Sequence, residues 1–190
     1  MTAPRVLFPI FVDLAGRDVL VVGGGPVAER KIAELLEAGA SVRVVAKDVT
    51  DAIAELSATG DLALEQRPFE GSDVPGAWLV VAATDDPVVQ RYVADAAERA
   101  RVHCVAVDDP KNSTAYGGSI LRRGPVVVAI STSGEAPALA RLVREVLEQA
   151  LPEADWVEEA RALRERWRKE GTPMASRFEE LVRAFKERAG

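Results

Sequence analysis

The sequence is poor in the residues that build disulfide frameworks and histidine-based metal sites. Its 190 residues include one cysteine, Cys104, and one histidine, His103. A single cysteine cannot form an internal disulfide, which is typical of the reducing cytoplasm, so we expect a cytoplasmic protein. A metal site built on imidazole needs two or more histidines at short spacing, so we expect no metal site. We interpret Cys104 as a small buried residue and His103 as a residue at the entrance of a strand.

Basic charge and long apolar runs are also scarce. Acidic residues outnumber basic ones by 30 to 24, and the net charge is −6. Nucleic acids and anionic membranes both bind basic surfaces, so this charge argues against either as a partner. No apolar run approaches the roughly 20 residues of a membrane span. The amino-terminal stretch also lacks the basic and apolar segments of a secretory signal.

Apolar segments at regular intervals predict a parallel sheet. Hydrophobic residues make up 48% of the chain, which is enough for one full domain and a small appendage. Strand-like runs lie at 19–22, 41–46, 62–67, 78–83 and 102–107. Segments with helical spacing separate most of them. This alternation predicts an α/β fold with helices on both faces of a parallel sheet.

A glycine-rich turn joins the first strand to the first helix. It reads Gly23-Gly24-Gly25-Pro26-Val27-Ala28, with the spacing G-x-G-x-x-A. In this motif the first glycine permits a tight turn, the second lets the backbone approach a pyrophosphate, and the small third residue lets the helix pack on the strand. Pro26 fits the first helical turn, where its missing N–H would be unpaired. We therefore predict a Rossmann-type dinucleotide site, with a ligand-free tight turn as the alternative.

Polar residues follow the second and fourth predicted strands. Lys47 and Asp48 come after the second, and Thr84 and Asp85 come after the fourth. An acidic residue after the second strand commonly binds the ribose hydroxyls of NAD. Asp48 arrives two residues late and beside a cation, which leaves NAD or NADP open. We expect Asp48, Thr84 and Asp85 to lie at the cofactor.

Asp108 directly follows the fifth predicted strand. In open α/β sheets ligands bind at the carboxyl ends of the strands, where an ionisable group can exchange a proton with a substrate. A turn-forming aspartate before Pro110 fits the spacing equally well. A hydroxyl cluster at 131–133 precedes a later helix, and no histidine is available to activate it. Capping or carboxylate binding therefore suits this cluster better than nucleophilic catalysis.

The pattern changes after Asp108. Apolar stretches at 116–121 and 126–131 are separated by four residues, which suits a hairpin rather than a crossover helix. A helix with an apolar stripe from Leu139 to Leu147 follows, and then two amphipathic helices separated by 171–173. We predict domains at 1–112, 113–151 and 152–190. Because the second half has little core of its own, we expect a homodimer through the hairpin and the stripe.

Basic residues gather in the second half of this acidic chain. They are Lys111, Arg122, Arg123, Arg141 and Arg144. Such a concentration of cations suits a polyanionic small molecule. A solvated charged surface is an equally good interpretation for any one of these residues.

Four blocks of this sequence together resemble the amino-terminal region of the sirohaem synthase family. They run from Val21 to Lys31, from Ala82 to Asp86, from Val107 to Lys111 and from Ser131 to Arg141. The blocks occur in the family's order, and the resemblance extends from about residue 8 to residue 152. In this resemblance Ala115 and Gly118 replace an aromatic residue and a proline, which bears on the shape of the substrate pocket.

The resemblance implies a precorrin-2 dehydrogenase that oxidises precorrin-2 to sirohydrochlorin with NAD. Some members of the family also insert ferrous iron to give sirohaem, and the sequence leaves open whether iron or cobalt is inserted here. The family's essential aspartate falls on Asp108, and its nucleotide contacts fall on Pro26, Val27, Lys47 and Asp48.

The resemblance also implies a substrate side to the site. A tetrapyrrole that carries eight carboxylates would explain the basic residues. We predict substrate contacts from five residues, which are Lys111, Ser119, Thr132, Ser133 and Arg141. The alternative from a different class is a regulatory module that binds NAD without catalysis and acts through its helical tail. A sensor of that kind would need no polyanion site.

Overall fold

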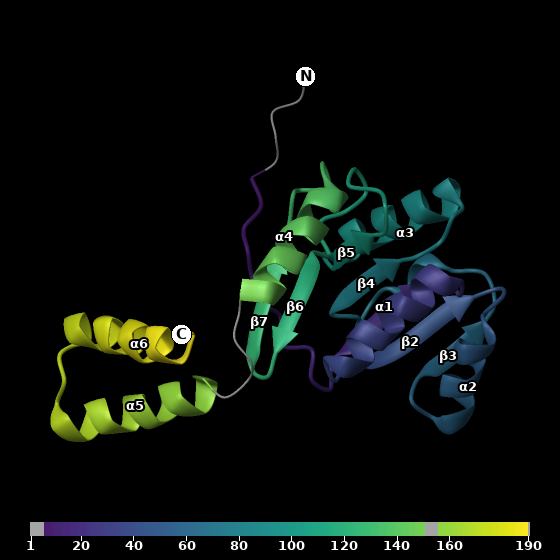
Figure 1. The fold of residues 1–190 in the computed structure, drawn as a ribbon. Helices are drawn as coiled ribbons and strands as arrows, with labels where there is room; N and C mark the ends of the chain where they lie inside the picture. The colour runs from purple at the N-terminus through teal and green to yellow at the C-terminus, as the bar shows by residue number, and fades with distance from the viewer. Residues whose placement is uncertain (1–5, 151–155, 190) are drawn as a thin grey trace. The chain divides into compact units, whose positions relative to one another are not determined.

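Five parallel strands form the sheet in the first part of the chain (Figure 1). They are β1 (Asp18–Val22), β2 (Ser41–Ala46), β3 (Ala63–Gln66), β4 (Leu79–Ala82) and β5 (His103–Ala106), in the order β3-β2-β1-β4-β5. The structure is a computed structural model that describes residues 6–150 and 156–189. The order reverses between β1 and β4, which is the switch point of doubly wound folds. The predicted Rossmann-type parallel sheet is therefore confirmed.

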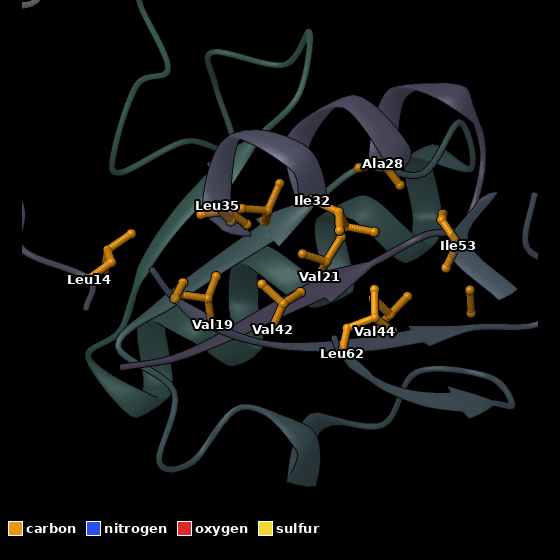
Figure 2. Packing of buried hydrophobic residues seen from close by; sticks show 14 residues of the cluster. Leu14, Val19, Val21, Ala28, Ile32, Leu35, Val42, Val44, Ile53 and Leu62 are labelled. Carbon is orange, nitrogen blue, oxygen red and sulfur yellow. The ribbon is translucent and has the colours of Figure 1, made fainter. Parts of the chain in front are cut away.

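Helices cover both faces of the sheet. They are α1 (Pro26–Glu37), α2 (Asp51–Thr59) and α3 (Pro87–Ala100). Val19 and Val21 of β1 belong to the core under α1, where they pack with Ile32 (Figure 2). Leu20 and Val22 alternate with them and belong to the core under α3. The continuous apolar run of β1 is thus explained by burial on both faces.

Side-chain hydroxyls cover the outer edge of β5. The Ser113 hydroxyl accepts a hydrogen bond from Ala106 N–H at 3.0 Å, and the Thr114 hydroxyl accepts one from Cys104 N–H at 2.8 Å. Thr114 N–H in turn donates to the Cys104 carbonyl at 2.9 Å. An edge strand whose backbone N–H and carbonyl groups are hydrogen-bonded in this way has fewer of them free to pair with a strand of another chain.

The chain divides into two compact units, Met1–Gly117 and Gly118–Gly190. Residues 113–117 fall within the first unit because Ser113 and Thr114 pair with β5. The predicted domain boundary between 151 and 152 lies outside the described residues.

The second unit begins with an antiparallel hairpin and a helix. These are β6 (Ser119–Arg123), β7 (Val126–Ile130) and α4 (Pro137–Ala150). The first strand starts at Ser119, later than the predicted 116–121, and the preceding Gly118 passes so close to β7 that a Cβ there would lie 2.7 Å from the Ile130 carbonyl oxygen. Arg122 and Arg123 belong to β6 rather than to the connection. The loop is only Gly124 and Pro125, and Gly124 has the positive φ of 54° that such two-residue turns require.

The last two helices pack against each other. They are α5 (Trp156–Glu170) and α6 (Met174–Ala189), and they confirm the predicted helix pair separated by 171–173. Trp167 is 7% exposed, and its indole N–H donates to Glu180 at 2.7 Å. Within the ranges that the structure describes, no helix is long and apolar enough to span a membrane.

Candidate functional site

A cavity of about 910 Å³ opens at the carboxyl ends of the sheet strands. The loops after β1, β2, β3, β4 and β5 all line it. The predicted residues in its lining are Gly23, Gly24, Gly25, Pro26, Val27, Lys47, Asp48, Thr84, Asp85 and Asp108. Ala28 lies beneath them at 0% exposure, where its small side chain packs in the core under α1. The fold thus brings the predicted cofactor residues and Asp108 to one cavity.

The three glycines of the turn have different roles. A Cβ on Gly23, whose φ is 120°, would collide with the carbonyl oxygen of Ala83. A Cβ on Gly24 would collide with the carbonyl oxygen of Asp48. A Cβ on Gly25 would meet nothing within 4 Å, and φ there is −83°. The fold therefore needs glycine at the first two positions, whereas the third leaves open space beside the backbone, as the approach of a pyrophosphate requires.

The amino terminus of α1 faces the same space with unsatisfied donors. Gly25 is the residue before the first helical turn, and no side chain caps the helix there. The first backbone bond of the helix runs from Glu29 N–H to the Gly25 carbonyl at 3.0 Å. Among the described residues, the N–H groups of Val27 and Ala28 have no partner. These donors and the helix dipole suit an anionic phosphate, so the residues present fit a dinucleotide.

The loop after β2 holds the glycine turn in place. Thr50 N–H donates to the Gly24 carbonyl at 2.9 Å, and the Thr50 hydroxyl donates to Glu29 at 2.8 Å. Gly23 N–H donates to the Val45 carbonyl at 3.1 Å. Sequence reasoning missed Thr50 and Glu29, because a contact between residues 21 positions apart leaves no periodic signal.

Asp108 occupies an unusual backbone conformation at the end of β5. Its φ is 57°, in the left-handed region that aspartate tolerates better than most residues. The preceding Val107 is fixed on both sides: its N–H donates to Ala82, and its carbonyl accepts from the buried Gln90 side chain at 2.8 Å. The exposed Asp108 carboxylate has no hydrogen-bond partner among the described residues. The backbone is thus held while the carboxylate stays available to a ligand.

The neighbouring Asp109 has a different role. Its carboxylate accepts from Lys111 N–H at 3.0 Å and from the Asn112 side chain at 2.6 Å, and it thereby builds the turn that leads to Ser113. Sequence reasoning missed Gln90, which holds the backbone before Asp108. Spacing alone left Asp108 open as either a proton acceptor or a turn former, and in the structure the neighbouring Asp109 forms the turn.

The predicted substrate residues are divided between the two units. Lys111 is exposed in the turn after β5, whereas the other four lie in the second unit. The Thr132 hydroxyl accepts from Ala136 N–H at 3.2 Å, and Arg141 pairs with Glu145 at 2.8 Å. Ser119 begins β6, and Ser133 has a positive φ of 55° in the turn before α4. Their role in substrate binding stays a prediction.

Cys104 and His103, which we do not expect to take part in catalysis, lie in and at the start of β5. Burial raises the pKa of the Cys104 thiol to about 11, so it stays protonated and unreactive near neutral pH. His103 is exposed at the start of β5. Across residues 6–150 and 156–189, no group of three or more His, Cys, Asp or Glu could hold a metal ion.

A doubly wound sheet with a glycine turn, an uncapped helix terminus and a cavity at its switch point defines a Rossmann-type dinucleotide-binding protein. The family model described as "Putative NAD(P)-binding" matches residues 10–119, and the chain belongs to this family. A second model, described as "Sirohaem biosynthesis protein central", matches residues 123–150.

The chain is also similar to two siroheme synthases and to one solved structure. Siroheme synthase 3 of Aeromonas hydrophila is 48% identical over 145 residues, which are 76% of this chain and 31% of the relative. Siroheme synthase of Salmonella typhimurium is 46% identical over the same length, covering 76% and 32%. The chain thus spans about a third of the length of these relatives. The solved structure of SirC, precorrin-2 dehydrogenase, superposes with a TM-score of 0.74 at 26% identity and covers 93% of this chain and 88% of that one.

We predict that Gly25→Asp abolishes NAD binding without loss of folded stability. The new carboxylate has room to form but would stand where the pyrophosphate approaches, and it would repel the phosphates. Aspartate is also a better residue than glycine before a helix, so the melting temperature should not fall. Isothermal titration calorimetry with NAD and thermal melting measure the two effects.

Gly24→Ala serves as the contrasting variant, because its methyl group collides with Asp48 and should lower the melting temperature. If Gly25→Asp binds NAD as tightly as the unsubstituted protein, the pyrophosphate does not lie on this turn.

Proposed function

We propose that the chain is an NAD-dependent precorrin-2 dehydrogenase, which removes a hydride and a proton from precorrin-2 to give sirohydrochlorin. The observation that carries the proposal is the position of Asp108, whose carboxylate lines the same cavity as the glycine turn and has no hydrogen-bond partner within residues 6–150 and 156–189. Family membership, the siroheme synthase relatives and the SirC structure point to the same reaction.

NAD, when bound, supplies the acceptor for the hydride. The chain's own residues do the rest of the work. The α1 terminus binds the pyrophosphate through the Val27 and Ala28 N–H groups, and Gly25 leaves space for it. Loss of a hydride leaves a cationic tetrapyrrole that must release a proton, and Asp108 accepts that proton. A general base of this kind contributes about a hundredfold to ten-thousandfold in rate.

The second reaction that we propose is the insertion of ferrous iron into sirohydrochlorin, with iron as a substrate. Two pyrrole nitrogens must each lose a proton for the metal to enter, and Asp108, which lines the cavity at the end of β5 and has no hydrogen-bond partner among the described residues, would accept them. A module that only sensed NAD would not need such a carboxylate beside the cofactor. Incubating the protein with sirohydrochlorin and ferrous iron, and following the absorbance spectrum, tests the insertion.

Asp108→Asn should lower the single-turnover rate of precorrin-2 oxidation by at least about a hundredfold. Asparagine keeps the size of the side chain and tolerates the left-handed backbone, so only the ability to accept a proton is lost. The affinity for NAD should change little, because the pyrophosphate lies at the glycine turn.

Asp109→Asn is the matched control. Its amide oxygen can still accept from Lys111 N–H and preserve the turn, so the rate should fall only slightly. Equal and small losses in the two variants would show that Asp108 takes no proton and that the proton leaves to water.

We propose further that the protein is a homodimer through the hairpin and α4. Leu139, Leu142 and Val146 form an apolar stripe on α4 and are 51 to 56% exposed in the single chain. Ile120 of β6 is also exposed, at 37%. Large apolar side chains exposed along one stripe of a helix are typical of an interface with another surface. A second copy would bury the stripe against its own equivalent.

Light scattering should give twice the 20.4 kDa mass of one chain at micromolar concentration. Val146→Glu places a charge in the stripe and should produce a monomer. Val88→Glu, at an exposed valine of the first unit, should leave the dimer intact. A monomer for the unsubstituted protein, or a dimer that survives Val146→Glu, would contradict this interface.

A further inference from the structure

Arg67 lies where a Rossmann-type protein can discriminate between NAD and NADP. It directly follows β3 and lines the cavity. β2 and β3 pair in parallel with Ala46 opposite Gln66, so Lys47 and Arg67 are the next residues on neighbouring strands. In such folds an acidic residue near the end of β2 binds the 2′-hydroxyl of NAD, whereas a nearby arginine accommodates the 2′-phosphate of NADP. Arg67 is thus in place to serve as that arginine.

Every N–H group of Arg67 is already in use. Nε and Nη2 donate to Glu65 at 3.0 and 2.6 Å. Nη1 and Nη2 donate to the two oxygens of Asp73 at 2.9 and 2.6 Å, and Nη1 also donates to the Pro68 carbonyl at 3.1 Å. These bonds account for the full set of donors that a guanidinium carries. A phosphate at this point would find no free donor on Arg67.

The charge of Arg67 is also neutralised by its surroundings. Glu65 and Asp73 place two carboxylates on the guanidinium, and Arg43 balances the second charge by lying 3.7 Å from the Glu65 carboxylate and 3.9 Å from the Asp73 carboxylate. An added phosphate would therefore meet a cluster of two acids and two arginines with no net positive charge.

The cluster cannot easily open to release Arg67. Asp73 is 7% exposed and closes the short helical turn η1 (Gly71–Asp73), where it accepts from Glu70 N–H at 2.9 Å. The Arg67 guanidinium holds the pKa of this carboxyl below its usual range, so it is ionised at neutral pH. Turning Arg67 toward a ligand would leave a buried carboxylate with one partner fewer, which is strongly unfavourable.

We propose that Glu65 and Asp73 are specificity-determining residues, which make the site select NAD over NADP by occupying Arg67. This inference rests on the proposed dinucleotide site and adds the device that sets its preference. Asp48, exposed at the end of β2, is left to accept hydrogen bonds from the ribose hydroxyls. Lys47, the other basic residue that follows these two strands, is next to Asp48 in the sequence.

The test compares NAD and NADP in calorimetric titrations of the full chain. Glu65→Ala removes the acceptor of Nε and of one Nη2 donor of Arg67 but leaves the buried Asp73 pair in place, so the fold should persist, as thermal melting can verify. The unsubstituted protein should bind NAD at least about tenfold tighter than NADP. A freed charge-assisted donor should strengthen NADP binding by about tenfold in Glu65→Ala. The affinity for NAD should change less than about twofold.

Two further variants isolate the role of Arg67. Glu55→Ala removes the same side chain from the exposed surface of α2 and should alter neither affinity. In Glu65→Ala/Arg67→Met, the gain in NADP affinity should disappear. Equal binding of NAD and NADP by the unsubstituted protein, or a gain that persists without Arg67, would overturn this inference alone. If neither dinucleotide binds, the proposed function fails and this inference fails with it.

Discussion

The cavity depends on the contact between the glycine turn and two neighbouring backbone carbonyls. Gly23 and Gly24 pass so close to the carbonyls of Ala83 and Asp48 that no side chain fits between them. This contact brings the ends of β1 and β4 together with the loop after β2, and it fixes where α1 begins. The uncapped helix terminus then faces the space beside Gly25, where nothing lies within 4 Å of a Cβ position. One steric constraint therefore produces both the fold of the turn and its ability to hold a phosphate.

Around this turn, the chemistry is decided by which polar groups are already paired. Asp109 is used in building a turn, and Arg67 is used in binding Glu65 and Asp73. Asp108 lies next to Asp109 and lines the same cavity as Arg67, yet its carboxylate is unpaired among the described residues. In the proposed function this difference leaves Asp108 able to accept a proton and Arg67 without a free donor for a phosphate. The proposal of an NAD-dependent dehydrogenase thus depends on which groups are already hydrogen-bonded rather than on residue type alone.

Much of this was accessible from the sequence, because local rules govern it. The glycine spacing, the apolar runs and the helical stripes predicted the sheet, the hairpin and the helix pair that the structure shows. The contacts that were missed are long-range: Gln90 reaches Val107 across 17 positions, and Ser113 reaches β5 from the loop that follows it. Periodicity carries no signal for such pairs. The substrate contacts of Ser119 and Thr132 stay predictions, since they depend on how a tetrapyrrole lies against the second unit.

The central claim is that one cavity binds NAD and takes a hydride and a proton from precorrin-2. The most direct measurement mixes the purified protein with precorrin-2 and NAD and follows NADH and sirohydrochlorin together by their absorbance. The account predicts that the two products appear at the same rate and in equal amounts, and that neither appears without the protein. Tight binding of NAD with no NADH formed from precorrin-2 would contradict it.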